Sequence, residues 1–287
     1  MFAAKTLAIS YLASLVAYQY IRPQYSIAVL MYHNVTEILP PSYRSIRPED
    51  FRLQMKYLKD QCEVLSIQDL VKAYRSPRHF TRSRKPRVII TFDDGFRDNY
   101  TNAFPILKEF SLPATCFVVP SWFSKTDPST AKRIFLNEKE IKEMRNNGIS
   151  FCSHTLSHPM LPHLDYKEQK AEILKGRQEL YERISDPVVL DAFAYPFGEY
   201  NQDTMEILKE LKFKIGLTVW HHLNGPNDNP LRLKRLTADG RDGMIKFASQ
   251  VNPFGFKAYD KIIKRLRTFN LPRSEGQRIS GPYPTEN

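Results

Sequence analysis

From residue 27 onward, the sequence alternates between short apolar runs and longer segments whose apolar residues recur at helical spacing. The run IAVLMY (27–32), for example, precedes a segment (47–60) in which Phe51, Met55 and Leu58 fall on one helical face. About seven such alternations follow one another, which is typical of parallel strands joined by crossover helices. The pattern therefore predicts an α/β fold, either a closed barrel or an open doubly wound sheet.

The remaining elements are expected at similar intervals. We expect strands at 87–92, 114–119, 149–153, 192–195, 214–219 and 231–236, and helices at 66–75, 99–110, 137–148, 166–184, 203–212 and 242–251. Pro105 predicts a kink or a late start in the second of these helices, because proline has no backbone N–H to donate. Cys116 and Cys152 lie in apolar strands, so we interpret both as small buried hydrophobic residues rather than disulfide partners.

The 287 residues suffice for one large domain, which we place at 25–255. The segment before it, 1–24, is largely apolar between Lys5 and Arg22, but its apolar run is shorter than the ~20 residues that a helix needs to cross a bilayer. A signal peptide, a surface helix and a buried first helix are alternatives, and we favour an uncleaved membrane anchor. Residues 256–287 are predicted to form a basic amphipathic helix and a loose polar tail.

The formal net charge of +11 indicates an anionic neighbour. A nucleic acid is a poor candidate, because no binding motif accompanies the charge. The basic helix after residue 256 could equally pack on the domain with its charged face in water. Together with the apolar N-terminus, however, it favours association with a membrane surface.

Two adjacent acidic residues, Asp93 and Asp94, directly follow the apolar run IITF. Taken alone, they could cap the next helix. However, the strand expected at 149–153 is followed by His154 and His158, whose spacing brings two imidazoles to one side of a turn. Because the ends of parallel strands carry the chemistry of such folds, these residues predict a metal site with two histidines, one carboxylate and open positions.

The neighbouring residues narrow the type of site. Thr155 stands where a zinc protease with a His-Glu motif would have glutamate, so a protease is a poor interpretation. With one aspartate as a ligand, the other is left to take a proton from water. A third strand end carries Tyr195, Pro196 and Phe197, a rigid turn that either serves only as a turn or directs a backbone N–H at a developing oxyanion. We expect Tyr195 and Pro196 to contact the substrate.

The sequence resembles the polysaccharide deacetylases, carbohydrate esterase family four, in three motifs that occur in the same order: TFDDG (91–95), HTLSHP (154–159) and FAYPFGEYN (193–201). The resemblance implies a distorted (β/α)7 barrel, with Asp93 as general base. It also implies that Asp94, His154 and His158 bind zinc, or another transition metal such as cobalt or nickel. The backbone N–H of Phe197 would help to form an oxyanion hole.

Two features depart from the family pattern. Members often carry an arginine near the position of Ala194 to orient the base; here Arg235, at the end of the last expected strand, is either its substitute or an ordinary surface arginine. The late histidine that protonates the leaving amine has no clear counterpart either. The candidates are His33, His163 and the pair His221–His222, and we favour His33 because it follows a strand directly.

The resemblance implies hydrolysis of the acetamide of an N-acetylated amino sugar, in a cell-surface polysaccharide or a lipid-linked glycan, with release of acetate. The motif variants are similar to those of poly-N-acetylglucosamine deacetylases. We expect the enzyme to be associated with the membrane through its N-terminus, outside the cytoplasm, with the cytoplasmic face as the alternative. A glycan-binding relative with weak or no catalysis and an O-acetyl carbohydrate esterase stay open as further alternatives.

Overall fold

The computed structural model describes residues 26–76, 80, 83, 85–127 and 129–252. The predicted anchor (1–24) and the predicted basic helix and tail (256–287) lie outside the described residues. Within the described residues, no helix has both the length and the apolar character needed to cross a membrane.

The fold is built on a curled parallel sheet whose path runs β10-β1-β5-β6-β7-β8-β9, with β4 added beside β5. The strands are β1 (Ile27–Tyr32), β2 (Asn34–Val35), β3 (Ser45–Ile46), β4 (Glu63–Leu65), β5 (Arg87–Asp94), β6 (Ala114–Val118), β7 (Ile149–Ser153), β8 (Ala192–Ala194), β9 (Ile215–Leu217) and β10 (Leu236–Thr237). Leu233 pairs with Leu217 of β9, and Leu236 pairs with Leu30 of β1, so this last segment joins the two ends of the sheet. The strands therefore form the predicted distorted (β/α)7 barrel rather than an open sheet.

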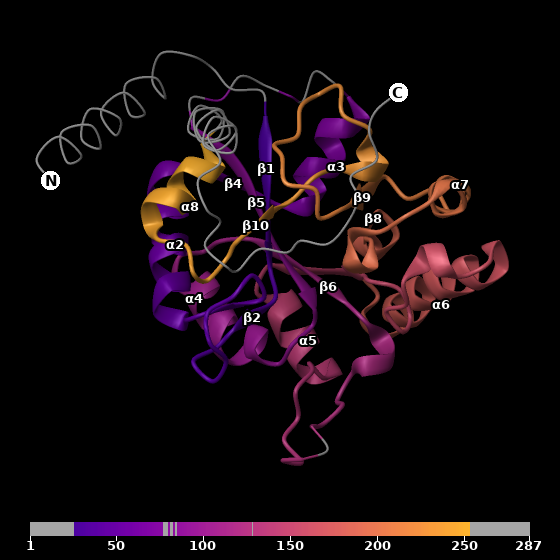
Figure 1. Ribbon diagram of the computed structural model, residues 1–287, viewed down its shortest axis with the longest axis horizontal. Coiled ribbons are helices and arrows are strands. Elements are labelled where there is room, and N and C mark those ends of the chain that lie inside the picture. The colour runs from indigo at the N-terminus through magenta and orange to yellow at the C-terminus, as the bar shows by residue number, and fades with distance from the viewer. Residues whose placement is uncertain (1–25, 77–79, 81–82, 84, 128, 253–287) are drawn as a thin grey trace, which may run out of the picture.

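Helices lie on the outside of the strands (Figure 1). They are α2 (Pro48–Gln61), α3 (Ile67–Arg75), α4 (Phe104–Glu109), α5 (Glu138–Asn146), α6 (Tyr166–Ile184), α7 (Gln202–Glu210) and α8 (Met244–Val251), and short turns of helix are η2 (Asn99–Ala103), η3 (Pro120–Trp122), η4 (Leu161–His163), η5 (Pro187–Leu190), η6 (Pro196–Gly198) and η7 (Pro230–Arg232). The side chains of Ser66 and Asn137 cap α3 and α5 through reciprocal bonds with Asp69 and Glu140. These capping boxes begin the helices where the sequence predicted.

Two predicted elements differ from the structure. The helix expected at 99–110 is a π-helical turn, η2, followed by α4, in which Pro105 stands in the first turn, so the late start is confirmed. The last strand, expected at 231–236, shrinks to two residues. Pro230 opens a turn of helix there, and Leu233 is bonded to β9, so only Leu236–Thr237 remain to pair with β1.

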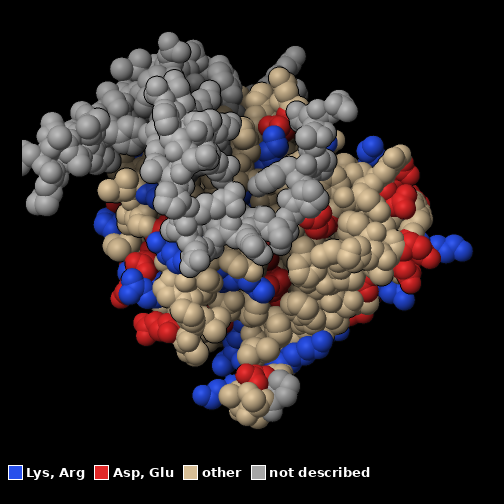
Figure 2. Space-filling view, viewed as in Figure 1, with Lys and Arg blue, Asp and Glu red and all other residues tan. Residues whose placement is uncertain are grey.

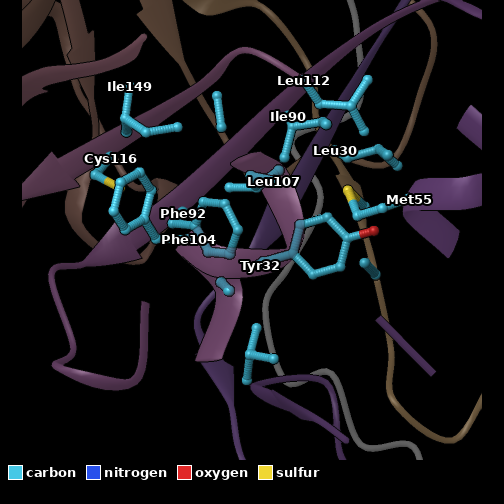
Figure 3. Packing of buried hydrophobic residues seen from close by; sticks show 14 of the residues in the cluster. Leu30, Tyr32, Met55, Ile90, Phe92, Phe104, Leu107, Leu112, Cys116 and Ile149 are labelled. Atoms are coloured by element: carbon cyan, nitrogen blue, oxygen red, sulfur yellow. The ribbon is translucent and has the colours of Figure 1, made fainter. Parts of the chain in front are cut away.

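Besides a cluster around Phe193 that packs β8 against α6 and α7, the core has two larger parts. One fills the space between the sheet and α2, α4 and α5, where the rings of Tyr32, Phe51 and Phe92 pack with centroids 5.2–5.8 Å apart (Figure 3). The other lies among residues that come from the strands themselves, including Ile89, Phe117 and Cys152, and it also packs on α3. All three cysteines are free and buried, as predicted for Cys116 and Cys152. The barrel is therefore filled with apolar side chains below the level of the acidic pair.

Candidate active site

Strand β5 ends on the acidic pair, and the two carboxylates leave it in different directions. Residues alternate between the faces of a strand, which places Asp93 on the same side as Thr91 and Ile89. Asp94 has a φ of 72°, and the left-handed backbone continues at Gly95, φ 74°. A Cβ on Gly95 would lie 2.9 Å from Val118 Cγ1, so only glycine fits there. The turn thus separates two like charges that adjoin in the sequence.

The Asp93 carboxylate forms a two-point ion pair with Arg235, with Nη1–Oδ1 and Nη2–Oδ2 distances of 2.7 Å. Arg235 is fully buried, and its Nε donates to the carbonyl of Thr218 at 2.8 Å. Burial alone would raise the pKa of Asp93, but the adjacent Arg235 charge holds it at about 2. Asp93 is therefore ionised and fixed in orientation. Arg235 lies immediately before β10, not at a strand end as predicted.

The two histidines lie on the loop that follows β7. The His154 backbone N–H donates to the carbonyl of Val118, and its Nδ1 lies 2.7 Å from the carbonyl of Ala194. A proton on Nδ1 satisfies that contact and leaves Nε2 free to bind a cation. Thr155 and His158 both have left-handed backbone, with φ of 66° and 64°, and the Thr155 hydroxyl accepts from the His158 N–H. This strained turn brings the second imidazole back over the strand end.

Asp94, His154 and His158 meet at one point. Their ligand atoms all lie within 4.8 Å of one another, and Asp94 Oδ1 is 3.8 Å from His154 Nε2 and 3.4 Å from His158 Nε2. Ligands at ~2.1 Å from a tetrahedral cation are about 3.4 Å apart, so the observed spacing fits a zinc-sized ion. Two imidazoles and one carboxylate also suit zinc, cobalt and nickel by donor type. The residues present therefore fit the metal implied by the resemblance.

Burial tunes this cluster toward cation binding. It lowers the pKa of His154 to about 3 and also lowers that of His158, so both imidazoles are neutral, as metal ligands must be. Burial and then the Asp93 charge raise the pKa of Asp94 to about 6. Arg44, which is half-exposed, lies 2.9 Å from Asp94 Oδ2. A bound cation, like Arg44, would offset the unfavourable burial of the negative charge on Asp94.

Helix α6 holds the histidine loop, which the sequence did not reveal. The Glu172 carboxylate accepts from the backbone N–H groups of Leu156 and Ser157, at 3.2 and 2.9 Å. One turn later, Gly176 packs directly on the loop, where an added Cβ would lie 2.6 Å from Leu156 N. The sequence feature that could have indicated this contact was a single glycine within a predicted helix, one turn after a glutamate.

The third predicted motif contributes less than expected. The Tyr195 side chain is fully buried, and its hydroxyl donates to the carbonyl of Leu231. Pro196 is also buried and starts η6. Phe197 has left-handed backbone, φ 59°, and is 52% exposed, with its ring centroid 4.6 Å from that of His158. Of these three side chains, only that of Phe197 lies beside the histidines.

The structure distinguishes among the histidines that were candidates for the general acid. His33 follows β1, its carbonyl accepts from the Asn99 side chain at 2.7 Å, and its buried Nδ1 has no partner among the described residues. Burial lowers its pKa to about 4, and the charges of Asp93 and Arg44 also act on it. His163 is exposed on η4, and the pair His221–His222 lies on an exposed to half-buried loop. His33 is therefore the candidate that lies near the acidic pair.

A profile of the family described as polysaccharide deacetylase matches residues 81–216, which include both aspartates and both histidines. Residues 81–216 thus form a polysaccharide deacetylase domain. The barrel, the order of the motifs and the carboxylate–histidine cluster at the strand ends are thus those of a family domain.

Named deacetylases are among the relatives. The Bacillus subtilis protein YxkH, whose name assigns it to the polysaccharide deacetylases, is 31% identical over 195 residues, 66% of this chain but only 63% of its own length. The poly-beta-1,6-N-acetyl-D-glucosamine N-deacetylase of Staphylococcus epidermidis is 28% identical over 70% of this chain and 71% of that protein. The solved structure of the Streptococcus pyogenes deacetylase PplD in complex with acetate has a TM-score of 0.66 and 28% identity, covering 76% of this chain and 94% of that chain.

Replacing Gly176 by alanine tests the support of the histidine loop. Helix propensity alone would stabilise the protein by ~0.5–1 kcal/mol. Because the new Cβ collides with the backbone of the loop, we instead expect the free energy of unfolding to fall by ~1–3 kcal/mol and zinc affinity to fall about tenfold or more. Urea unfolding and zinc titration measure the two effects. Lys175→Ala, on the exposed side of α6, is the control, and a stabilised G176A protein with native zinc affinity would contradict this role.

Replacing Arg235 by methionine should leave the Asp93 carboxylate buried and unpaired, and lower the free energy of unfolding by ~3–5 kcal/mol at neutral pH. In the native protein the pKa of Asp93 lies below that of an unfolded aspartate. The pair therefore stabilises the fold above about pH 4, and this stabilisation is lost as the pH falls toward 2. In the variant, burial raises that pKa instead, so its deficit should shrink on acidification in urea unfolding.

Arg241→Met is the matched control for this change, because Arg241 also pairs with a carboxylate, that of Asp239, but is 45% exposed. Its loss should cost less than about 1 kcal/mol. A deficit in R235M as small as that of the control, or one independent of pH, would contradict the buried ion pair.

Proposed function

We propose that the protein is a metal-dependent hydrolase that removes the acetyl group from N-acetylated amino sugars, with N-acetylglucosamine in a polysaccharide as the substrate class. The observation that carries the proposal is the pairing of an Asp94–His154–His158 cluster with a separate, ionised Asp93 at one end of the barrel. The names of the relatives support the same reaction: one is a poly-N-acetylglucosamine deacetylase, and a solved neighbour is a deacetylase with acetate bound.

In this proposal Asp93 accepts a proton from the attacking water, and Arg235 holds its oxygens in place. A carboxylate with a pKa of about 2 is always ionised near neutral pH, but it is a weak base toward ordinary water. A divalent cation held by Asp94, His154 and His158 would supply the missing activation, as a Lewis acid toward the acetamide carbonyl and the water. The low pKa of the base and the cation site therefore belong to one mechanism.

The remaining roles concern the oxyanion and the leaving amine. The η6 turn, fixed by buried Pro196 and the left-handed Phe197, would present the Phe197 N–H to the developing oxyanion. His33 is neutral near pH 7 because its pKa is lowered, so it would pass a proton on rather than serve as a charged acid. The negative charge of Asp93 acts on His33, which supports transfer of a proton from Asp93 through His33 to the leaving amine.

The glycan-binding alternative rested on a missing arginine and a missing histidine. Arg235 now contacts the Asp93 carboxylate at both oxygens, and His33 lies near it. Both observations favour catalysis over binding alone.

We further propose that the enzyme acts at a membrane surface, outside the cytoplasm. The support is in the sequence, in the apolar segment 1–24 and the basic segment 256–287. On the face shown in Figure 2, Lys and Arg side chains are interspersed with Asp and Glu, so the described residues show no single basic patch on this face.

The proposal is tested by acetate release from N-acetylglucosamine oligomers with the full chain, with zinc and with a chelator. We expect release only with metal. Asp93→Asn should retain stoichiometric zinc and lose about 10²–10⁴-fold in turnover, whereas His158→Ala should lose zinc binding as well. His163→Gln, on the exposed turn η4, is the matched control and should keep both. Substantial turnover by D93N, or a wild-type protein that binds no metal, would refute the mechanism.

The role of His33 has its own test. If His33 delivers the proton to the amine, His33→Gln should slow N-deacetylation by about 10²–10⁴-fold. Hydrolysis of 4-nitrophenyl acetate should stay near the native rate, because its phenolate leaves without a proton. Rates on the two substrates are compared by acetate assay and absorbance. An equal loss on both would assign His33 to another role.

A further inference from the structure

A chain of side-chain contacts begins and ends at the metal-type cluster, and most of its members are aromatic. Trp122 lies 5.2 Å from His158, Phe135 4.9 Å from Trp122, and Phe96 5.2 Å from Phe135, measured between ring centroids. Arg44 lies over the Phe96 ring at 5.9 Å and returns to Asp94 at 2.9 Å. We call Trp122, Phe135 and Phe96 the aromatic wall.

The wall is fixed to the same strand end as the acidic pair. Phe96 comes just after β5 and Trp122 from the turn η3, whereas Phe135 comes from the segment between η3 and α5, which extends away from the body at the lower edge of the view (Figure 1). The N–H of Leu136 donates to the carbonyl of Gly95 at 2.9 Å, and the N–H of Arg97 donates to that of Ile134 at 2.8 Å. These two backbone hydrogen bonds lie on either side of the β-bridge between Phe96 and Phe135. They hold the aromatic wall at a fixed distance from Asp94.

Packing does not account for these three side chains. Each is only partly buried, and none belongs to the apolar clusters of the core. Half-exposed aromatic faces beside charged groups suit a ligand that is apolar on its face and polar at its edge. A pyranose ring has this character, because its C–H groups form a face and its hydroxyls a polar rim. An acyl chain would instead place apolar groups against the charges of Arg44 and Asp94.

We propose that the aromatic wall binds a pyranose unit next to the one whose acetamide reaches Asp94, in the same N-acetylated glycan. This inference rests on the proposed function, whose substrate it extends from one sugar to a chain. The wall is continuous with the catalytic cluster through the contact between Trp122 and His158, and Arg44 supplies a donor for hydroxyls at its other end. The wall is therefore a determinant of chain-length preference.

The test uses Phe135→Leu and Phe96→Leu, because these residues do not touch a proposed metal ligand and leucine keeps the apolar volume. Phe135→Tyr keeps the flat face. Tyr181→Leu, an exposed aromatic residue on α6, is the matched control. Binding of N-acetylglucosamine dimer and hexamer to the zinc-loaded full chain is measured by calorimetry in the inactive D93N background, and thermal unfolding establishes that each variant is folded.

We expect both leucine variants to bind the hexamer about tenfold more weakly, with little change for the dimer, and F135Y and Y181L to match the parent. Unchanged hexamer affinity in the leucine variants, or equal loss for both oligomers, would overturn the inference, and so would a parent that does not bind the hexamer.

Activity separates this inference from the proposed function. If the wild type releases acetate but the leucine variants show no change that depends on chain length, the role of the wall is refuted and the proposed reaction is retained. Hexamer binding that needs the wall, without acetate release by the wild type, refutes the reaction but retains the wall.

Discussion

The buried ion pair between Arg235 and Asp93 connects the closure of the barrel to its chemistry. Arg235 lies in the segment that joins β9 to β1, and Asp93 ends the long strand β5. A buried pair of charges stabilises a fold only if its geometry and remaining hydrogen bonds are satisfied. Here both carboxylate oxygens are paired, and Nε finds the carbonyl of Thr218. The position of the last segment therefore determines the orientation and the charge of the Asp93 carboxylate.

The same pair lets two adjacent aspartates perform different tasks. Asp93 is held ionised by an arginine, whereas Asp94 is left with burial and a like charge that Arg44 offsets only in part. Separating them requires left-handed backbone at Asp94, and the surrounding turns add the same conformation at Thr155, His158 and Phe197. Such residues cost about 1–3 kcal/mol each. The extensive contacts of α6 with the histidine loop show how this strain is held.

The periodicity of the apolar residues predicted those strands and helices whose formation depends on local interactions. The runs that became β1, β5, β6 and β7 are continuous and apolar, and the capped helices carry their own end signals. Parallel topology then brought Asp94, His154 and His158 together, since the ends of such strands share one edge. The partner of Arg235, the inward burial of Tyr195 and the contact of Gly176 with the loop depend on residues far apart in the chain. No spacing in the sequence encodes them, so the burial of Tyr195 was not anticipated and Gly176 was missed.

Whether the aromatic wall is rigid or mobile determines how the binding of a sugar there affects catalysis. Interactions made equally in the ground and transition states lower KM without raising kcat. Trp122 touches His158, and the backbone that carries Phe135 is bonded beside Asp94, so a sugar held by the wall is placed relative to the catalytic cluster itself. Binding energy from the neighbouring sugar can then orient the acetamide toward Asp93, which acts on kcat/KM through positioning. A rigid wall has this effect, whereas a mobile one would contribute affinity alone.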